Sequence, residues 1–247
     1  TITEWYGRLG NNLQQVSNAI YYCRQNKINF RCPSHPLFRR FSIYFGQDSD
    51  YRSRFFYFDG RIDPFTGVEY PDERDFECEI EALNVNRRDI LRTHVLPKFN
   101  FSIGSPLDGD TLVAHVRSGD VFSPDEPPPL TYVQNPLSFY IDTIRQFNRT
   151  IIVTEGDEGN PVLEALARLE NVTIQSSSLE RDFSTLLRAR NILTSGVGTF
   201  GVAAALCSQH VERVYYSDLY MTEHLNPTML GADVAVYMTK LGDYIKV

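Results

Sequence analysis

The sequence predicts an α/β protein, and two observations carry that prediction. After residue 110, short apolar runs and amphipathic stretches alternate five times, which is typical of a parallel, doubly wound sheet. One of the runs, Thr150–Thr154, is apolar throughout, as expected for a strand covered on both faces. The chain has 247 residues, of which 42% are hydrophobic, so it is long enough to bury a sizeable core.

The stretch Thr111–Phe122 (TLVAHVRSGDVF) organises this part of the chain. Its alternating pattern predicts a strand that places His115 and Arg117 on one face, close to the carboxyl end. The residues up to Asp120 then turn the chain away. Ligands of open α/β sheets bind beyond the carboxyl ends of the strands, where an arginine suits a phosphate or a carboxylate. The alternative is a structural ion pair between Arg117 and Asp120.

The elements that follow have recognisable starts and ends. Asn135-Pro136 and Asn160-Pro161 each predict a helix whose N-cap is asparagine and whose first residue is proline. The remaining predicted elements are the strand Asn171–Gln175, the helix Glu180–Arg190, the strand Asn191–Thr194, the helix Thr199–Ser208 and a closing strand, Val211–Ser217.

The first part of the chain has a less regular pattern. A β-type run over residues 1–6 leads through a glycine turn into a helix that we expect over Asn12–Gln25. This geometry offers backbone N–H groups to an anion, although an ordinary turn capped by Asn11 or Asn12 would look the same. Further expected elements are the strands Phe41–Phe45 and Arg54–Phe58, the helix Glu79–Val95 ended by Pro97, and a linker, Asn100–Asp110.

Charge and composition exclude several classes of protein. The net charge of -7 argues against broad nucleic-acid binding, and no apolar run approaches the 18 residues of a membrane span. Four scattered cysteines without a C-x-x-C motif indicate neither a metal site nor a disulfide scaffold, and pairing of Cys32 with Cys78 stays open. The chain starts at Thr1 without a signal peptide, so we expect an excised domain or a mature fragment. The N-x-[ST] sequons at Asn100, Asn148 and Asn171 leave the compartment open between secretory lumen and cytoplasm.

A glycine-rich turn gives one alternative function. Gly196–Gly201 (GVGTFG) matches G-x-G-x-x-G between a strand and a helix, and Asp218 lies about where a ribose-binding acid would follow. This pattern is typical of a nicotinamide-dependent oxidoreductase. In such proteins, however, the motif normally belongs to the first βα unit, whereas here it comes late and only one clear strand follows it.

Three motifs in order give a family resemblance. His115–Asp120 (HVRSGD) resembles the H-x-R-x-G-D segment of α1,2-fucosyltransferases and the related α1,6- and protein O-fucosyltransferases. Gly7–Asn12 (GRLGNN) looks like their N-terminal G-x-L-G-N loop. Asp182-Phe183, followed by Ser195–Phe200, is similar to their acidic and S-x-T-F region.

The resemblance implies a GT-B type fold, with two Rossmann-like domains facing across a cleft: an acceptor-side domain over 1–108 and a nucleotide-sugar-binding domain over 109–247. It implies an inverting glycosyltransferase that moves fucose from GDP-fucose to a glycan hydroxyl without a metal or another cofactor. Its partners would be that nucleotide sugar and a glycan acceptor, with no nucleic acid and no membrane span.

Site residues follow from the same motifs. Arg117 would bind the β-phosphate and stabilise the departing GDP, and His115 would line the nucleotide pocket, unless it is an ordinary core histidine. Asp182 would read the guanine edge, unless it only favours the start of a helix. The backbone around Gly198, with Thr199 and Phe200, would hold phosphate and pack beside the nucleotide, and Gly10 and Asn11 would contact the pyrophosphate from the other domain.

The sequence departs from the family at two places. Many relatives have a second serine or asparagine where Val197-Gly198 stands, and many α1,2-enzymes have an arginine in place of Ser118. A transferase for another nucleotide sugar, or a non-catalytic glycan- or nucleotide-binding module, therefore stays an alternative. The general base is expected to be Asp120, which could instead pin the loop or orient Arg117; Asp125 and Glu126 are the other candidates.

Overall fold

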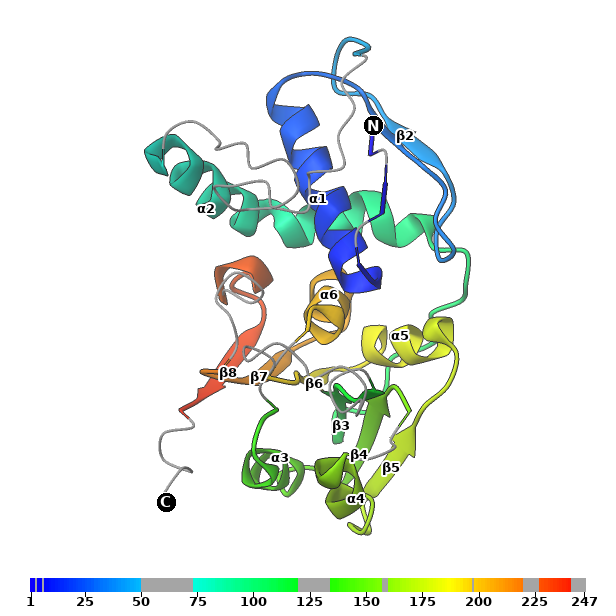
Figure 1. Cartoon of the computed structure of the whole chain (residues 1–247), viewed down its shortest axis with the longest axis vertical. Coiled ribbons are helices and arrows are strands. Elements are labelled where there is room, and N and C mark those ends of the chain that lie inside the picture. Colours follow the sequence, from blue (N-terminus) through cyan, green and yellow to red (C-terminus); the bar gives the residue numbers. More distant parts are fainter. Residues whose placement is uncertain are drawn as a thin grey trace. The chain divides into compact units, whose positions relative to one another are not determined.

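A computed structural model describes residues 1–2, 4–5, 7–49, 73–119, 134–156, 160–196, 198–219 and 227–240, without the side chains of 73–80. The chain forms two compact units (Figure 1). The first contains Thr1–Phe101 and Asn226–Gly231, and the second contains Ser102–Leu225 and Ala232–Val247. The chain therefore passes between the units three times. Along the chain, the first boundary between the two compact units follows Phe101. The domain boundary expected at 108/109 stays a prediction.

The second unit is built on six strands that pair in parallel throughout. They are β3 (Thr111–Val116), β4 (Arg149–Thr154), β5 (Val172–Gln175), β6 (Asn191–Leu193), β7 (Arg213–Ser217) and β8 (Ala235–Thr239). Their spatial order is β5-β4-β3-β6-β7-β8. Counted within the unit this is 3-2-1-4-5-6, the order of the Rossmann fold. The α/β class is confirmed, and its Rossmann-type sheet is consistent with the GT-B type fold that the motifs imply.

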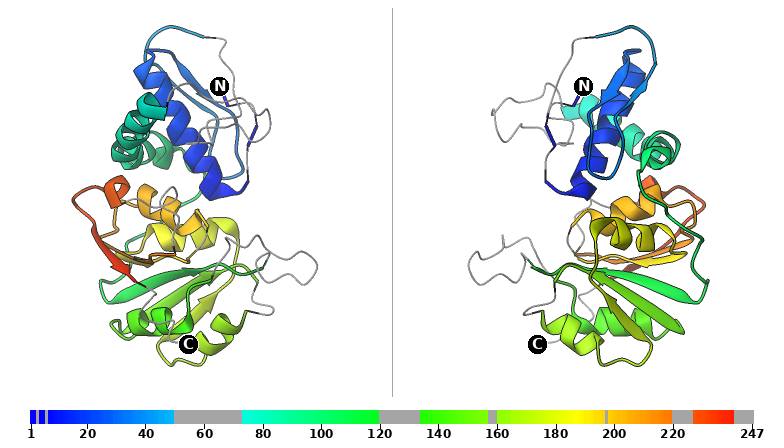
Figure 2. Two further views of the ribbon diagram at one scale, coloured as in Figure 1. Left: turned by 60° about the vertical axis from the view of Figure 1, so that its left-hand side comes forward. Right: turned by 90° about the vertical axis from the view of Figure 1, so that its right-hand side faces the viewer.

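Helices cover both faces of this sheet. α3 and α4 lie on one face, and α5 and α6 lie on the other (Figure 2). Their bounds are Leu137–Ile144 for α3, Pro161–Leu166 for α4, Leu179–Leu187 for α5 and Phe200–Cys207 for α6. The arrangement explains why the central strand β3 is buried at all six positions: each of its faces meets a helical layer.

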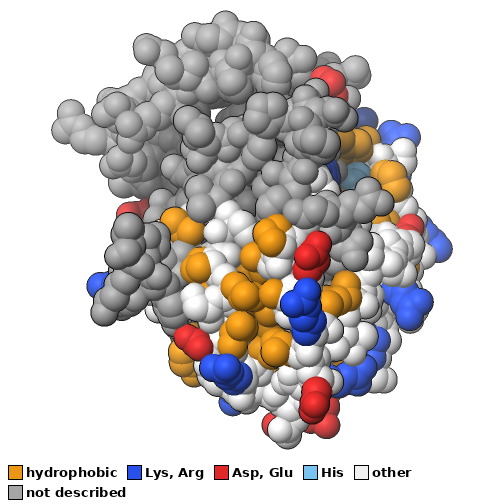
Figure 3. Space-filling model, turned by 60° about the horizontal axis from the view of Figure 1, so that its bottom comes forward, with side chains coloured by type: hydrophobic (Ala, Val, Ile, Leu, Met, Phe, Trp, Pro, Cys, Tyr) orange, Lys and Arg blue, Asp and Glu red, His pale blue; other side chains and the backbone are white. Residues whose placement is uncertain are grey.

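The core under α3 and α4 is formed by alternate residues of β3. Leu112, Ala114 and Val116 pack there with aromatic and aliphatic side chains that include Phe139 and Leu163. Figure 3 views this side of the unit, where hydrophobic side chains gather in the middle and charged ones surround them. His115 and Arg117 belong to the opposite set of alternate positions and therefore face the α5 and α6 side.

The two predicted Asn-Pro helix starts have different outcomes. Asn160 is the N-cap of α4, as predicted, and its Oδ1 accepts from the N–H groups of Val162 (3.0 Å) and Leu163 (3.4 Å). The N-cap prediction for Asn135 is wrong, because α3 begins at Leu137 after Pro136. The Asn135 side chain instead binds the ends of β6 and β7: its Nδ2 donates to the Thr194 carbonyl and its Oδ1 accepts from Ser217 Oγ.

Strand β8 is absent from the sequence prediction, which ends the series at Ser217. It is an edge strand that pairs with β7 alone. Its side chains are exposed or half-buried at all five positions. A continuous apolar run, the signal that identifies a central strand, is therefore missing. Two strands, and not one, follow the glycine-rich turn.

The first unit is mainly helical over its described residues. It contains α1 (Leu9–Gln25), α2 (Glu73–Ile90) and a small antiparallel sheet of β1 (Phe30–Cys32) and β2 (Phe41–Ile43). In place of the strand expected over residues 1–6, the described part shows an isolated bridge at Ile2. The strand expected over 54–58 lies outside the described residues. A second Rossmann-like sheet in this half stays a prediction.

The C-terminal end of α2 changes its winding before Pro97. A π-helical turn, Leu91–Val95, and a 3₁₀ turn, Leu96–Lys98, continue the helix. Proline has no N–H, and its ring clashes with the carbonyl four residues earlier, so a regular α-helix cannot continue through it. The predicted end of this helix near Pro97 is confirmed. None of the helices in the described ranges is long and apolar enough to span a membrane.

A relay of polar side chains organises the start of the first unit. The Leu37 N–H donates to His35 Nδ1 (3.1 Å), so His35 Nε2 carries the proton and donates to Asn12 Oδ1 (3.1 Å). Asn12 Nδ2 then donates to Gln15 Oε1 (3.4 Å), and Gln15 Nε2 donates to the Glu4 carbonyl (3.1 Å). Protonation of His35 would place a donor against the Leu37 N–H. Burial lowers the pKa of His35 to about 4.

This pKa predicts a pH-dependent stability of the first unit. The unfolded chain binds the His35 proton with a pKa near 6.5, whereas the folded chain binds it near 4. The stabilisation is thus fully present above pH 6.5 and is lost as the pH falls toward 4. Allowing for the partial exposure of His35, we expect a loss of about 1–2 kcal/mol between pH 7.5 and 4.5.

Urea unfolding, monitored by tryptophan fluorescence, measures this loss of stability in the first unit. Trp5 is the only tryptophan of the chain, and its ring lies edge-on to His35 at 5.1 Å. The difference in unfolding free energy between wild type and His35→Gln should shrink on acidification. A difference that stays constant with pH would contradict the assignment.

Candidate functional site

The candidate site lies in the second unit, where the strand order reverses. The connection from β3 leads to β4 on one side, and the connection from β6 leads to β7 on the other. Loops that leave in opposite directions open a crevice beyond the carboxyl ends of the two strands, which is where ligands bind in open α/β sheets. The turn that begins at Arg117 follows β3 and the glycine-rich turn follows β6, so the sheet brings both motifs to this crevice.

Arg117 and Gly198 lie against each other there. Gly198 has φ +97°, and a Cβ at its position would lie 2.9 Å from Arg117 Nη1 and 3.4 Å from Arg117 Cδ. The glycine is therefore required both by its backbone conformation and by the guanidinium next to it. A half-buried cation occupies the place where the backbone of a glycine-rich turn would meet a phosphate.

The backbone of the β3 turn is anchored by Asn160 and lies beside Glu155. Asn160, the N-cap of α4, uses its Nδ2 to donate to the Arg117 carbonyl (3.3 Å). Gly119 has φ +67°, and a Cβ there would lie 3.5 Å from Glu155 Oε2. Glu155 is exposed and directly follows β4. A carboxylate is thus placed beside the turn that carries Arg117.

His115 is enclosed on the α6 side of the sheet. It is only 4% exposed, and its Nδ1 lies 3.2 Å from Ser195 Oγ. A Cβ at Gly201 would lie 3.2 Å from His115 Cβ. The Phe200 ring lies 5.2 Å away, centroid to centroid. Two glycines of the G-x-G-x-x-G pattern, Gly198 and Gly201, therefore provide space for the side chains of Arg117 and His115.

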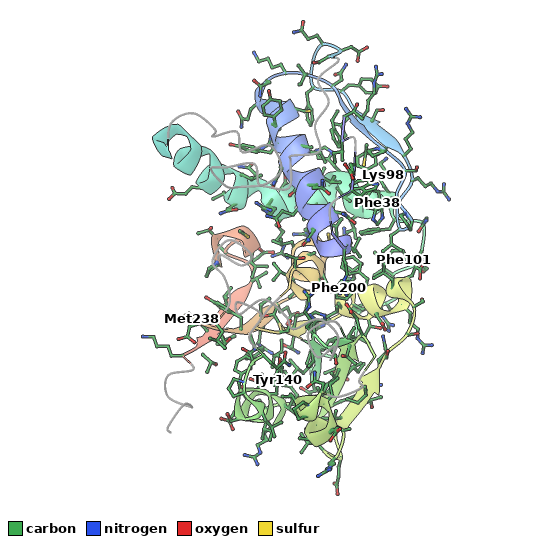
Figure 4. The ribbon with its side chains drawn as sticks, in the orientation of Figure 1. Phe38, Lys98, Phe101, Tyr140, Phe200 and Met238 are labelled. Atoms are coloured by element: carbon green, nitrogen blue, oxygen red, sulfur yellow. The ribbon has the colours of Figure 1, made fainter. Side chains whose placement is uncertain are left out.

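Thr199 and Phe200 mark the start of α6. Thr199 is its N-cap residue and Phe200 its first residue. The half-buried Phe200 ring also contacts Phe183 at 5.3 Å. Phe200 of α6 and Tyr140 of α3 lie on opposite sides of the sheet (Figure 4). The structure thus brings together five of the predicted site residues: Arg117, His115, Gly198, Thr199 and Phe200.

Asp182 fixes the loop between β5 and α5. Its Oδ1 accepts from Gln175 Nε2 at 2.7 Å, and its Oδ2 accepts from the Ser177 N–H at 3.0 Å. It is 7% exposed and lies in the first turn of α5. Each carboxylate oxygen accepts one hydrogen bond in the loop and has a second acceptor position. The structural role considered for Asp182 is present, and the guanine contact stays a prediction.

Gly10 and Asn11 belong to the first unit, where they lie in a helix and not in a loop. α1 begins at Leu9, earlier than predicted, and its N-cap residue is Arg8. Gly7 has φ +65°, and a Cβ there would collide with the Asn11 side-chain amide. The G-x-L-G-N motif is thus a tight turn at Gly7 that leads directly into the first turn of α1. Neither Asn11 nor Asn12 is the N-cap.

The three carboxylates considered as general bases, Asp120, Asp125 and Glu126, lie outside the described residues. Within those residues no group of three or more His, Cys, Asp or Glu side chains could hold a metal ion. Cys32 is a free thiol, so it is not paired with Cys78. Burial raises the pKa of Cys32 to about 12, which keeps it protonated and unreactive.

Sequence reasoning missed Glu155, Asn160 and the contact roles of Gly119 and Gly201. Asn160 was predicted only as a helix cap. Glu155 follows an apolar strand, and parallel pairing places it one strand away from Arg117. Its only signal in the sequence is an acidic residue at the end of a buried strand.

Comparisons with known proteins give few matches. No protein-family model matches the chain, and no curated protein sequence matches it. Among solved structures, the ADP-heptose LPS heptosyltransferase II of E. coli matches with 12% sequence identity and a TM-score of 0.32. The match covers 69% of this chain and 44% of that enzyme, so the chain spans less than half of its length.

The contact between Gly198 and Arg117 predicts that a methyl group added at position 198 lowers the stability of the protein. Gly198→Ala forces an L-residue to a positive φ and a Cβ onto the guanidinium, at a cost on the order of 1–3 kcal/mol. We expect the melting temperature to fall by several degrees. The matched control is Gly156→Ala, at the end of β4, where a Cβ meets nothing within 4 Å. Equal melting temperatures for the two variants would contradict this packing.

Proposed function

We propose that the protein is a glycosyltransferase that binds a nucleotide sugar in the crevice of its second unit. The observation that carries the proposal is the Arg117 guanidinium against Gly198, at the carboxyl ends of β3 and β6. A planar fork of donors beside a glycine backbone suits a diphosphate. The fucosyltransferase-like motifs favour GDP-fucose as the donor, and a glycan hydroxyl as the acceptor.

In this proposal Arg117 stabilises the transition state. Negative charge develops on the β-phosphate as the bond to the sugar breaks, and a cation fixed beforehand at that point lowers the barrier. Asn160 anchors the Arg117 carbonyl, Gly198 leaves room for the guanidinium, and Phe200 offers an aromatic face beside the nucleotide. The charge is stabilised by the chain's own residues, and the family resemblance implies no metal.

Two carboxylates are candidates for the general base in this proposal. Asp120 directly follows Gly119 in the chain, and Glu155 lies beside Gly119 at the end of β4. Either carboxylate would take the proton from the acceptor hydroxyl. Gly10 and Asn11 stay proposed pyrophosphate contacts from the first unit.

A nicotinamide-dependent oxidoreductase is the second candidate. β6, the glycine-rich turn, α6 and β7 form a βαβ unit, and the exposed Asp218 follows β7 as a ribose-binding acid would. Strand β8 also removes the objection that only one strand follows the motif. Against this candidate, the glycine turn belongs to the fourth strand of the unit, and Arg117 lies against its middle glycine.

Nucleotide binding tests the proposal. We expect GDP to raise the melting temperature, because a ligand at 100 times its Kd stabilises the folded state by about 2.7 kcal/mol. UDP and NAD measured in parallel distinguish the candidates. Equal stabilisation by UDP would remove the preference for a guanosine donor, and stabilisation by NAD alone would support the oxidoreductase.

Arg117→Ala completes this experiment. The variant should lose the GDP-induced shift and at least 100-fold in the rate of GDP release from GDP-fucose, measured as hydrolysis in which water accepts the fucosyl group. Arg145→Ala is the matched control, because that arginine is the C-cap residue of α3 and its side chain is 77% exposed. Loss of the shift in both variants would point to a general charge effect.

A metal chelator tests the metal-free chemistry separately. GDP release from GDP-fucose should continue at an unchanged rate in EDTA, since Arg117 supplies the positive charge. The assay is repeated with added Mn²⁺. A rate that EDTA abolishes and Mn²⁺ restores would show that a metal ion carries that charge.

A further inference from the structure

Ser118 has a buried hydroxyl without a partner in the middle of the β3 turn. The residue is 0% exposed, and its Oγ makes no hydrogen bond within the described part of the chain. It lies between Arg117, which contacts Gly198, and Gly119, which has a positive φ. The unpaired donor is therefore next to the proposed phosphate-binding cation in the chain.

Two polar side chains near this turn, Asn160 and His115, do have partners. Asn160 uses both ends of its amide, and His115 pairs with Ser195. More than nine in ten buried polar groups in folded proteins have a partner, and leaving one without it is unfavourable. Among the described residues, the Ser118 hydroxyl is therefore a donor without a partner, directly beside Arg117 in the chain.

The backbone of the turn allows the hydroxyl to reach a bound ligand. The Arg117 carbonyl is anchored by Asn160, so the turn is fixed on its strand side. Gly119, on the other side, tolerates both signs of φ. A rotation at Gly119 can change the orientation of Ser118 while Arg117 stays in place.

We propose that Ser118 is a ligand-binding residue whose Oγ–H donates to the diphosphate that Arg117 binds. This inference rests on the proposed function and adds a second donor to the same site. Because the hydroxyl is covered in the free chain, binding includes a rearrangement of residues 118–119. A hydroxyl that is unpaired without ligand and paired with it has opposite effects on folding and on binding.

Ser118→Ala separates these two effects. The melting temperature of the free variant should equal or exceed that of wild type, because the substitution removes an unpaired polar group. Its Kd for GDP, measured by calorimetry, should rise about tenfold or more, since hydrogen bonds to charged groups are strong. Its Kd for inorganic pyrophosphate should rise by a similar factor.

Thr150→Val is the matched control. Thr150 is also 0% exposed, and its Oγ1 also has no partner, but it lies at the amino end of β4. This nearly isosteric change should leave the melting temperature equal or higher, with an unchanged Kd for GDP.

Three results would overturn the inference. Wild-type affinity for GDP in Ser118→Ala would remove the proposed hydrogen bond. A melting temperature that falls in the free variant would show that the hydroxyl already has a partner. Absence of GDP and pyrophosphate binding to wild type would end the proposed function and this inference together, whereas the first two results would leave the proposed function standing.

Discussion

The reversal of strand order between β3 and β6 is the constraint on which the candidate site depends. β3 pairs with β4 on one side and with β6 on the other, so the turns after β3 and β6 emerge side by side while their connections diverge. Arg117 and Gly198 are far apart in the sequence and meet only because of this pairing. The sheet therefore determines where the positive charge of Arg117 lies, and loss of the β3–β6 pairing would separate the two motifs.

Buried asparagines hold the strands in the positions that the site requires. Asn160 joins the start of α4 to the turn after β3, and Asn135 joins the segment before α3 to the ends of β6 and β7. At the opposite end of the sheet, Asn191 Nδ2 donates to the carbonyls of Gly109 and Thr111, and its Oδ1 accepts from Arg213. Each amide uses both of its ends, which favours one arrangement of the strands over alternatives. A site supported by such a network is preorganised for a ligand.

The sequence predicted the features that local physical chemistry determines, and it missed those that depend on neighbours. β3 was predictable from its two-residue alternation, β4 because a strand buried on both faces has to be apolar, and α4 because asparagine caps a helix that begins with proline. The same Asn-Pro pattern gave a wrong N-cap prediction at Asn135, because the amide of this residue forms hydrogen bonds at the ends of β6 and β7. β8 was missed because an edge strand needs no apolar pattern. Glu155 could not be assigned, since its place beside Gly119 follows from strand pairing alone.

A crystal structure of the protein with GDP tests the central claim most directly. The account predicts the diphosphate in the crevice beyond β3 and β6, with a β-phosphate oxygen within hydrogen-bonding distance of the Arg117 guanidinium and close to the backbone of Gly198. Binding of the diphosphate elsewhere in the second unit, away from Arg117, would contradict it.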